Sequence, residues 1–138
     1  MVSEMLQTHI RRYNLVTKKK QENTNSPLLE VRDLKTYFYT ADGIVKAVDS
    51  VDLNVYPGKT LGIVGESGCG KSITTKSILR LIDNPGKIID GTMNLYDKDH
   101  KNPQDIATLN TQELKKVRGG RISMIFQEPM TSFSPIHT

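Results

Sequence analysis

The chain has 138 residues, of which 36% are apolar and 25% are charged, so its composition is that of a folded domain and not of a disordered segment. Its apolar runs are shorter than the roughly 18 residues that a membrane-spanning helix needs, and its first residues lack the apolar stretch of a secretory signal. A single cysteine, Cys69, excludes an internal disulfide and a cysteine-rich zinc site, which favours a reducing compartment.

The net charge of +4 is concentrated near the N-terminus. Residues 1–26 carry five basic and two acidic residues, and KKKQENTNSP has no apolar period and ends in turn-forming residues. We interpret residues 1–26 as a flexible basic tail and residues 27–138 as part of one domain. A basic tail is also compatible with an anionic membrane surface or nucleic acid, but a solvated leader is the simpler interpretation, and no nucleic-acid partner is expected.

Two half-buried antiparallel strands are predicted after the tail. LLEVRDLKTYFY is rich in β-branched and aromatic residues, and the segment from Val45 to Val55 alternates apolar and polar residues. TADG between them is typical of a turn. The run TLGIVG, residues 60–65, then predicts a buried strand.

A helix is predicted next, from KSITTKSILRLI, with Ile78, Leu79 and Ile82 on one face and with Pro85 and Gly86 ending it. The segment GTMNLYDKD that follows favours a strand of an edge hairpin.

TQELKKVRGG favours a short helix capped by Thr111 and stopped by Gly119. RISMIFQ, residues 121–127, predicts a second buried strand. Parallel strands require a crossover such as the intervening helix. We therefore expect an α/β fold with an antiparallel part followed by the start of a parallel core sheet.

The stretch GESGCGKS fits the pattern G-x-x-x-x-G-K-[ST] at Gly65, Gly70, Lys71 and Ser72. A phosphate anion must be surrounded by several N–H donors at once, and glycines allow the chain to curl tightly enough for this. A helix that follows such a loop adds its free N–H groups and the positive end of its dipole. The segment therefore predicts a nucleotide phosphate site.

Each polar group of the loop has an expected role. Lys71 places a positive charge between the β- and γ-phosphates, and Ser72 offers a hydroxyl to Mg²⁺. Cys69 is interpreted as a small residue at a variable position, because no base is near enough in sequence to make it a nucleophile. The candidate binding residues of the loop are Gly65, Glu66, Ser67, Gly68, Cys69, Gly70, Lys71, Ser72 and Ile73.

Three classes of protein carry such a loop. Small-molecule kinases usually begin with it, whereas strand-like residues precede it here, and GTPases are expected to show an N-K-x-D motif, which this sequence lacks. The third class fits best. The segments LLEVRDLKTYF, GIVKAVDSVDL, GKTLGIVGESGCGKS and RGGRISMIFQEPMTSFSP resemble the ATP-binding subunit of ABC transporters, most closely the oligopeptide/dipeptide importer branch. The resemblance implies a P-loop NTPase fold of ABC type, with ATP and Mg²⁺ as cofactors.

The resemblance also implies roles for two residues outside the loop. Phe38 matches the aromatic residue that stacks on adenine in this family, with Tyr37 and Tyr39 as rivals. Gln127 matches the family glutamine that positions Mg²⁺ and the attacking water, so Gln127 and Lys71 are the candidate catalytic residues.

Further implications concern partners and location. Residues 128–133, EPMTSF, resemble the family segment that contacts the transmembrane permease, although SFSP stands here where SLNP is usual. The resemblance implies a second ATP-binding subunit, an indirect link to a solute-binding protein, and a peripheral position on the cytoplasmic face of the membrane.

Parts that the family uses for hydrolysis are missing from this sequence. It contains no apolar strand ending in Asp-Glu, no LSGGQ-like stretch and no later switch histidine, and Gln127 stands where SMIFQE would need an aspartate. We therefore expect the front part of an ATPase domain, incomplete at its C-terminus. Two hypotheses stay open: an ATPase subunit that powers peptide import, or a non-catalytic nucleotide-binding or interaction fragment.

Overall fold

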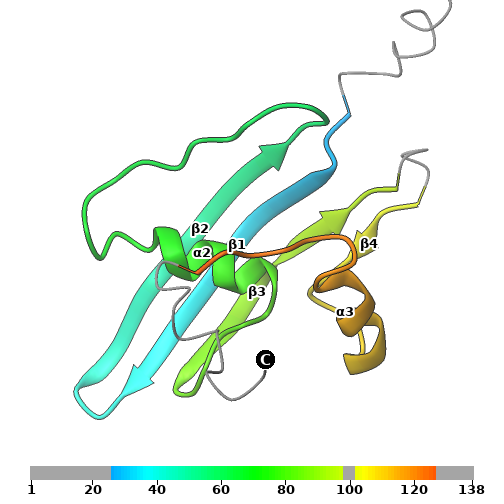
Figure 1. Ribbon diagram of the computed structural model, residues 1–138. Coiled ribbons are helices and arrows are strands. Elements are labelled where there is room, and N and C mark those ends of the chain that lie inside the picture. Colours follow the sequence, from blue (N-terminus) through cyan, green and yellow to red (C-terminus); the bar gives the residue numbers. More distant parts are fainter. Residues whose placement is uncertain (1–25, 98–101, 127–138) are drawn as a thin grey trace, which may run out of the picture.

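A four-stranded antiparallel sheet forms the centre of the structure, a computed structural model that describes residues 26–97 and 102–126. Figure 1 shows the strands side by side, in the order β2-β1-β3-β4. Their bounds are Leu29–Thr40 for β1, Gly43–Val55 for β2, Gly86–Leu95 for β3 and Gln104–Asp105 for β4.

The hairpin predicted for the first part of the chain is confirmed. β1 and β2 pair from Leu29 opposite Val55 to Thr40 opposite Gly43, so the turn lies at Ala41 and Asp42. Irregularities in the pairing fall near Asp33, which has a left-handed backbone with φ of 49°. Such bulges bend a strand and increase its twist.

The strand predicted around GTMNLYDKD is confirmed, but it begins earlier and lies inside the sheet. β3 pairs with β1 from Leu29 opposite Leu95 to Phe38 opposite Gly86. The edge position belongs instead to β4, a two-residue strand that the sequence did not predict. The Asp105 carboxylate fixes this end, because Oδ1 accepts hydrogen bonds from the backbone N–H groups of Met93 at 2.9 Å and Ala107 at 3.0 Å.

Helix α2, Lys71–Ile78, follows the glycine-rich loop and is shorter than the predicted segment. It ends because Arg80 adopts a left-handed backbone with φ of 53°. The N–H of Arg80 then bonds the carbonyl oxygen of Ser77, and the N–H of Leu81 bonds that of Lys76, both at 2.8 Å. These two bonds form the Schellman arrangement that ends many helices.

Helix α3, Thr111–Val117, is confirmed, but its cap is Asn110 and not Thr111. The Asn110 side chain accepts hydrogen bonds from the N–H groups of Gln112 and Glu113, both at 3.0 Å, and the Glu113 carboxylate accepts one from the N–H of Asn110 at 3.1 Å. This reciprocal pair is a capping box. Gly119, the predicted stop, has φ of 78° and lies two residues beyond Val117, the last residue of the helix.

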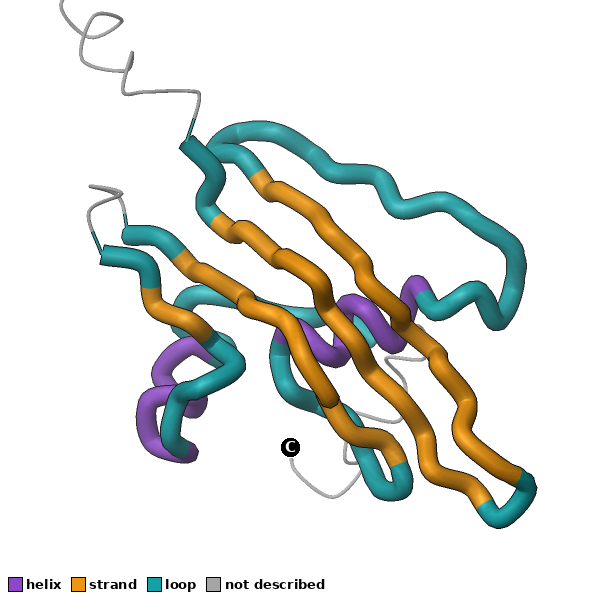
Figure 2. Tube along the Cα trace, turned by 180° about the vertical axis from the view of Figure 1, so that it is seen from behind, coloured by secondary structure: helices purple, strands orange, loops and turns teal. Residues whose placement is uncertain are grey.

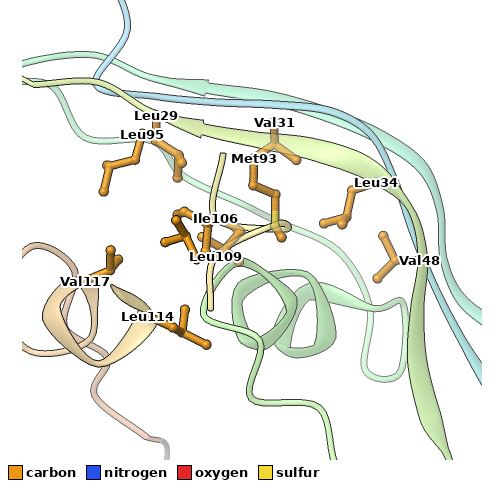
Figure 3. Packing of buried hydrophobic residues seen from close by; sticks show 11 residues of the cluster. Leu29, Val31, Leu34, Val48, Met93, Leu95, Ile106, Leu109, Leu114 and Val117 are labelled. Carbon is orange, nitrogen blue, oxygen red and sulfur yellow. The ribbon is translucent and has the colours of Figure 1, made fainter. Parts of the chain in front are cut away.

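The core lies between the sheet and the two helices. Figure 2, seen from behind, shows the strands in front of α2, so α2 covers one face of the sheet. Figure 3 shows Val31, Leu34 and Met93 of the sheet directed toward this space. The buried apolar cluster consists of Leu29, Val31, Leu34, Val48, Ile78, Met93, Leu95, Ile106, Leu109, Leu114 and Val117.

The two buried strands predicted for residues 60–65 and 121–127 are not found in the residues that the structure describes. Residues 60–65 have no strand conformation, and Val64 is 93% exposed. Residues 121–126 contain only one isolated bridge, between Arg118 and Ile122, and Ile125 is 91% exposed. A strand needs a neighbour that satisfies its backbone groups, and neither segment belongs to the described sheet. An apolar run alone does not supply that neighbour.

Candidate phosphate-binding site

The glycine-rich loop lies at the edge of the sheet formed by β2. In Figure 1 the chain leaves the end of β2, runs outside this strand, and returns to it where α2 begins. Residues 58–69 of this connection are exposed. The loop therefore presents its backbone to solvent, as a phosphate site requires.

Gly70 is the point at which the loop touches the sheet. A Cβ atom at this position would collide with the carbonyl oxygen of Ala47 in β2, and the backbone has φ of 92°. Both facts exclude a side chain without a shift of the loop. The last glycine of the motif is thus required by a close backbone approach that the sequence pattern does not reveal.

The N-terminus of α2 is open to an anion. Gly70 is its N-cap, with no side-chain cap, and its first turn contains no acidic residue. The first N–H groups of any helix lack partners within the helix, and they carry the positive end of its dipole. A phosphate group placed here would accept hydrogen bonds from the amides at the start of α2, a common arrangement for anions.

The ammonium group of Lys71 lies inside the curve of the loop. It donates hydrogen bonds to the carbonyl oxygens of Gly65 at 2.7 Å and Glu66 at 2.5 Å, and it lies 3.4 Å from the sulfur of Cys69. Residues six positions apart are thereby held together by one side chain. The ammonium group is placed where it can contact a phosphate that enters the loop, in exchange for these carbonyl oxygens.

Ser72 lies in the first turn of α2 with an exposed side chain. Its hydroxyl is an oxygen ligand of the kind that Mg²⁺ accepts when phosphate oxygens and waters complete the coordination. In the described residues no group of three or more His, Cys, Asp or Glu side chains could hold a metal ion. The Ser72 hydroxyl thus fits a magnesium ion that comes with a nucleotide.

The three aromatic candidates for adenine stacking lie on opposite faces of β1, with Phe38 on one face and Tyr37 and Tyr39 on the other. Phe38 is half-buried, and its ring covers Gly86, where a Cβ atom would lie 2.7 Å from Phe38 Cε1 and 2.6 Å from Ile82 Cγ2. Phe38 therefore shares the face of the sheet on which α2 lies, because Thr36, two residues earlier, bonds Ser77 of α2.

The two tyrosines are occupied elsewhere. The hydroxyl of Tyr37 donates a hydrogen bond to Asp49 at 2.6 Å, and Lys46 lies over its ring at 5.3 Å. Lys87 lies 5.7 Å from the ring centre of Tyr39. The hydrogen bond to Asp49 raises the pKa of Tyr37. These contacts favour Phe38 among the three residues, although its stacking role is still a prediction.

Two further predicted parts of the site are not tested. Gln127 and residues 128–133 lie outside the described residues. Asp90, an acidic residue that follows a short apolar run, accepts a hydrogen bond from Lys35 at 3.3 Å. Lys35 also donates to Asp33 at 2.7 Å. Asp90 is thus part of a surface ion-pair cluster on β1 and β3.

Comparisons with known proteins agree with this geometry. The family model of the ABC transporter matches residues 48–138. The chain is 47% identical over 114 residues to the oligopeptide transport ATP-binding protein AppD of Bacillus subtilis, which is 82% of this chain and 33% of that protein. It is 46% identical over 112 residues to a probable peptide ABC transporter ATP-binding protein of Sinorhizobium fredii, which is 80% of this chain and 32% of that one.

A third relative is named for the transport of a different solute. The chain is 43% identical over 118 residues to the peptidoglycan transport ATP-binding protein YejF of Agrobacterium fabrum, which is 86% of this chain and 21% of that protein. The chain spans about a third of the length of the first two relatives and about a fifth of the third.

The glycine-rich loop at the open end of α2 places this chain among the P-loop nucleotide-binding proteins. The match over residues 48–138 is more specific, and the chain belongs to the ABC transporter family, within its ATPase domain. Among the helices of the described residues, none is long and apolar enough to cross a bilayer.

Proposed function

We propose that this chain is the nucleotide-binding part of an ATP-binding subunit whose whole protein uses ATP to drive the import of peptides or similar solutes. The observation that carries the proposal is the position of Lys71. Its ammonium group lies within the curve of the loop, bonded to the carbonyl oxygens of Gly65 and Glu66, at the uncapped start of α2. Relatives at 46–47% identity are named as peptide or oligopeptide transport ATP-binding proteins, which supports the solute class.

In this proposal each candidate residue has a separate role in binding the nucleotide or in its hydrolysis. The amides from Gly68 to Ile73 surround the β-phosphate, and Lys71 exchanges its loop carbonyls for phosphate oxygens. Ser72 supplies one oxygen to Mg²⁺, and Gln127 positions the attacking water in the complete protein. Adenine stacks on Phe38. Hydrolysis also requires a carboxylate and a capping loop, which we assign to parts of the protein outside this sequence.

We further propose that residues 60–65 and 121–126 are parallel core strands of the complete domain. Their apolar side chains support this assignment, since Val64 and Ile125 are each more than 90% exposed in the described chain. Apolar side chains of this kind are normally covered in a native domain. Further strands on either side would satisfy their backbone groups and bury these residues.

The partners and the location that we propose for this chain are those of an ATP-binding subunit of an ABC transporter. We propose that residues 128–133 contact a transmembrane permease on the cytoplasmic face of the membrane. A second ATP-binding subunit would complete the nucleotide site, and a solute-binding protein would act indirectly.

The test is titration of labelled Mg-ATP against the wild-type chain, Lys71→Ala and Lys76→Ala. Loss of a charge-assisted hydrogen bond costs about 1.5–3 kcal/mol, so Lys71→Ala should raise the dissociation constant about ten- to a hundredfold. Lys76, in the last turn of α2, is the matched control and should bind as the wild type does. Equal affinity of the wild type and Lys71→Ala would reject the proposed site.

The alternative is a non-catalytic nucleotide-binding fragment or interaction module. It would use the same phosphate loop, with Lys71 and Ser72, to bind the nucleotide without hydrolysing it. Phosphate release by the whole protein that contains this sequence, in the presence of a permease and a second ATP-binding subunit, distinguishes the two. Lys71-dependent release favours the transporter ATPase, and binding without release favours the fragment.

A further inference from the structure

Two arginines connect the C-terminal end of α2 with the segment that contains β4 and α3. Arg80 follows α2 and Arg118 follows α3, and each donates hydrogen bonds to backbone carbonyl oxygens of the other segment. Arg118 donates from Nε to the carbonyl oxygen of Leu79 and from Nη2 to that of Arg80, both at 2.8 Å. Arg80 donates from Nη1 to the carbonyl oxygen of Leu109 at 2.6 Å. We call Arg80 and Arg118 together the arginine clasp.

The clasp completes the end of the helix. The last carbonyl oxygens of an α-helix have no partner within it. The Schellman bonds satisfy those of Lys76 and Ser77, and Arg118 binds the carbonyl oxygens of Leu79, the C-cap residue, and of Arg80, the first residue beyond the cap. Arg118 also brings a positive charge to the negative end of the helix dipole, where cations are favourable.

The backbone of Arg80 indicates that its side chain matters. Residue 80 has φ of 53°, a conformation that is common for glycine and unusual for a residue with a side chain. Glycine would end the helix with less strain, but it could not reach Leu109. The position therefore combines a left-handed helix end with a side chain that ties α2 to the segment after β4.

A helix as short as α2 depends on such anchors. It has eight residues, about 12 Å in length, and a helix of two turns is not stable alone in water. Its anchors are the approach of Gly70 to Ala47 at one end, the bond between Thr36 and Ser77 along its length, and the clasp at the other end. A tilt at the clasp would move the loop amides at the opposite end.

We propose that Arg118 is a positioning residue for the nucleotide site, which it does not touch: by holding the carbonyl end of α2 it sets where the loop amides and Lys71 lie. This inference rests on the proposed function for its effect on affinity. Its effect on the loop itself does not require a nucleotide. Arg118→Lys retains the charge and one donor group but cannot repeat the two-pronged contact of the guanidinium.

The experiment uses the full 138-residue chain as wild type, Arg118→Gln, Arg118→Lys, Arg121→Gln and Val117→Ala. Arg121 is the matched arginine, because it bonds the carbonyl oxygen of Tyr96 at 2.9 Å and the carboxylate of Asp97 at 2.8 Å, and the bonds described for it do not reach α2. Val117 is 2% exposed, so Val117→Ala lowers stability by making a cavity near the clasp while leaving its hydrogen bonds intact.

Two readouts are compared. The first is the dissociation constant for Mg-ATP, which Arg118→Gln should raise about three- to tenfold and Arg118→Lys by less, with Arg121→Gln and Val117→Ala unchanged. The second, without nucleotide, is hydrogen exchange at the amides of residues 68–74, which should accelerate in the Arg118 variants relative to both controls. If Arg118→Gln does not fold, the comparison of Arg118→Lys with Arg121→Gln in the same two readouts tests the positioning role of Arg118.

The outcomes separate the two proposals. Wild-type chain that binds Mg-ATP, together with Arg118 variants that match Arg121→Gln in both readouts, would overturn the positioning role and leave the proposed function intact. Equal effects of Val117→Ala and Arg118→Gln would also overturn it, since stability alone would then account for the change. Wild-type chain that does not bind Mg-ATP rejects the proposed function, while exchange at residues 68–74 still decides the role of Arg118.

Discussion

The hydroxyl groups of Thr36 in β1 and Ser77 in α2 lie 2.8 Å apart, and both residues are fully buried. Ser77 also donates to the carbonyl oxygen of Ile73 at 2.7 Å, which uses its one hydrogen. Thr36 is therefore the donor between the two hydroxyls. This bond joins the helix of the phosphate loop to the central strand of the sheet.

The direction of that bond predicts unequal effects of removing its two ends. Ser77→Ala leaves the Thr36 donor buried without its acceptor and should cost about 1–3 kcal/mol of unfolding free energy. Thr36→Val leaves the bond from Ser77 to Ile73 intact and should cost about 1 kcal/mol. Urea unfolding measures both, with Thr92→Val, at an exposed position of β3, as the control. A larger loss for Thr36→Val would contradict the assigned direction.

Gly70→Ala is expected to damage the loop more than Gly68→Ala. Both positions have left-handed backbones, with φ of 92° and 82°, so both substitutions carry backbone strain. Only at Gly70 would the new methyl group collide with Ala47, whereas no atom lies within 4 Å of a Cβ at Gly68. We expect the affinity for Mg-ATP to fall at least about tenfold further for Gly70→Ala, which is 1.4 kcal/mol. Equal losses would show that the contact with Ala47 is unimportant.

Cys69 should report occupancy of the loop. It is exposed and lies beside Lys71, so a maleimide should label it in the free chain. Mg-ATP at ten times its dissociation constant should slow labelling about tenfold, because only the free fraction reacts. Lys71→Ala should show little protection at the same concentration. An unchanged labelling rate at saturating nucleotide would place Cys69 outside the phosphate site.

Acid should weaken the hairpin through Asp49. The hydrogen bond from Tyr37, and secondarily the nearby Lys46, lower the pKa of Asp49 below its usual value of 3.8. A carboxyl group with a lowered pKa stabilises the fold above pH 3.8, and this contribution disappears as the pH falls through the folded-state value. Unfolding free energy measured from pH 6 to pH 2 should therefore decline less in Asp49→Asn than in the wild type. Asp42→Asn, in the turn, controls for the loss of charge, and matching slopes in all three chains would contradict the prediction.

The 138-residue chain alone should not turn over ATP at a measurable rate. Hydrolysis needs groups that hold the water and the developing charge, and removing one such group can cost about 10³–10⁵ in phosphoryl transfer. Phosphate release should be equal for the wild type and Lys71→Ala. Lys71-dependent release near 1 s⁻¹ would mean that a carboxylate such as Asp90 or Glu128 acts in catalysis. Asp90 would first have to leave Lys35.

Local patterns predicted the local structure. The alternation from Val45 to Val55 and the turn at TADG were sufficient for the hairpin, and the residues after the glycine-rich loop were sufficient for the start of α2. Asn110 stands three residues before Glu113, which is the spacing of a capping box, so the sequence also contains the signal for the observed cap of α3. Long-range contacts had no such signal: nothing in the sequence near Arg118 or Gly70 indicates Leu79 or Ala47 as a partner.

The two predicted core strands are not seen in the described residues for a related reason. Their apolar runs specify that residues 60–65 and 121–126 favour burial, but the backbone groups of a strand need a partner that these runs do not contain. The same limit applies to the place of β3, since its pairing with β1 depends on residues far away in sequence. Whether a strand is an edge or an interior strand is decided by the whole sheet.

The order of the strands also determines when each edge of β1 can be paired while the chain is being synthesised. β1 can pair with β2 as soon as the chain has emerged to Val55, but its other edge must wait for β3, because Leu29 pairs with Leu95. At about 5–20 residues per second, a ribosome leaves that edge of β1 open for a few seconds. Val31 and Leu34 lack their neighbour Met93 for at least that interval, so the nascent hairpin has both an open edge and an uncovered apolar face until β3 is made.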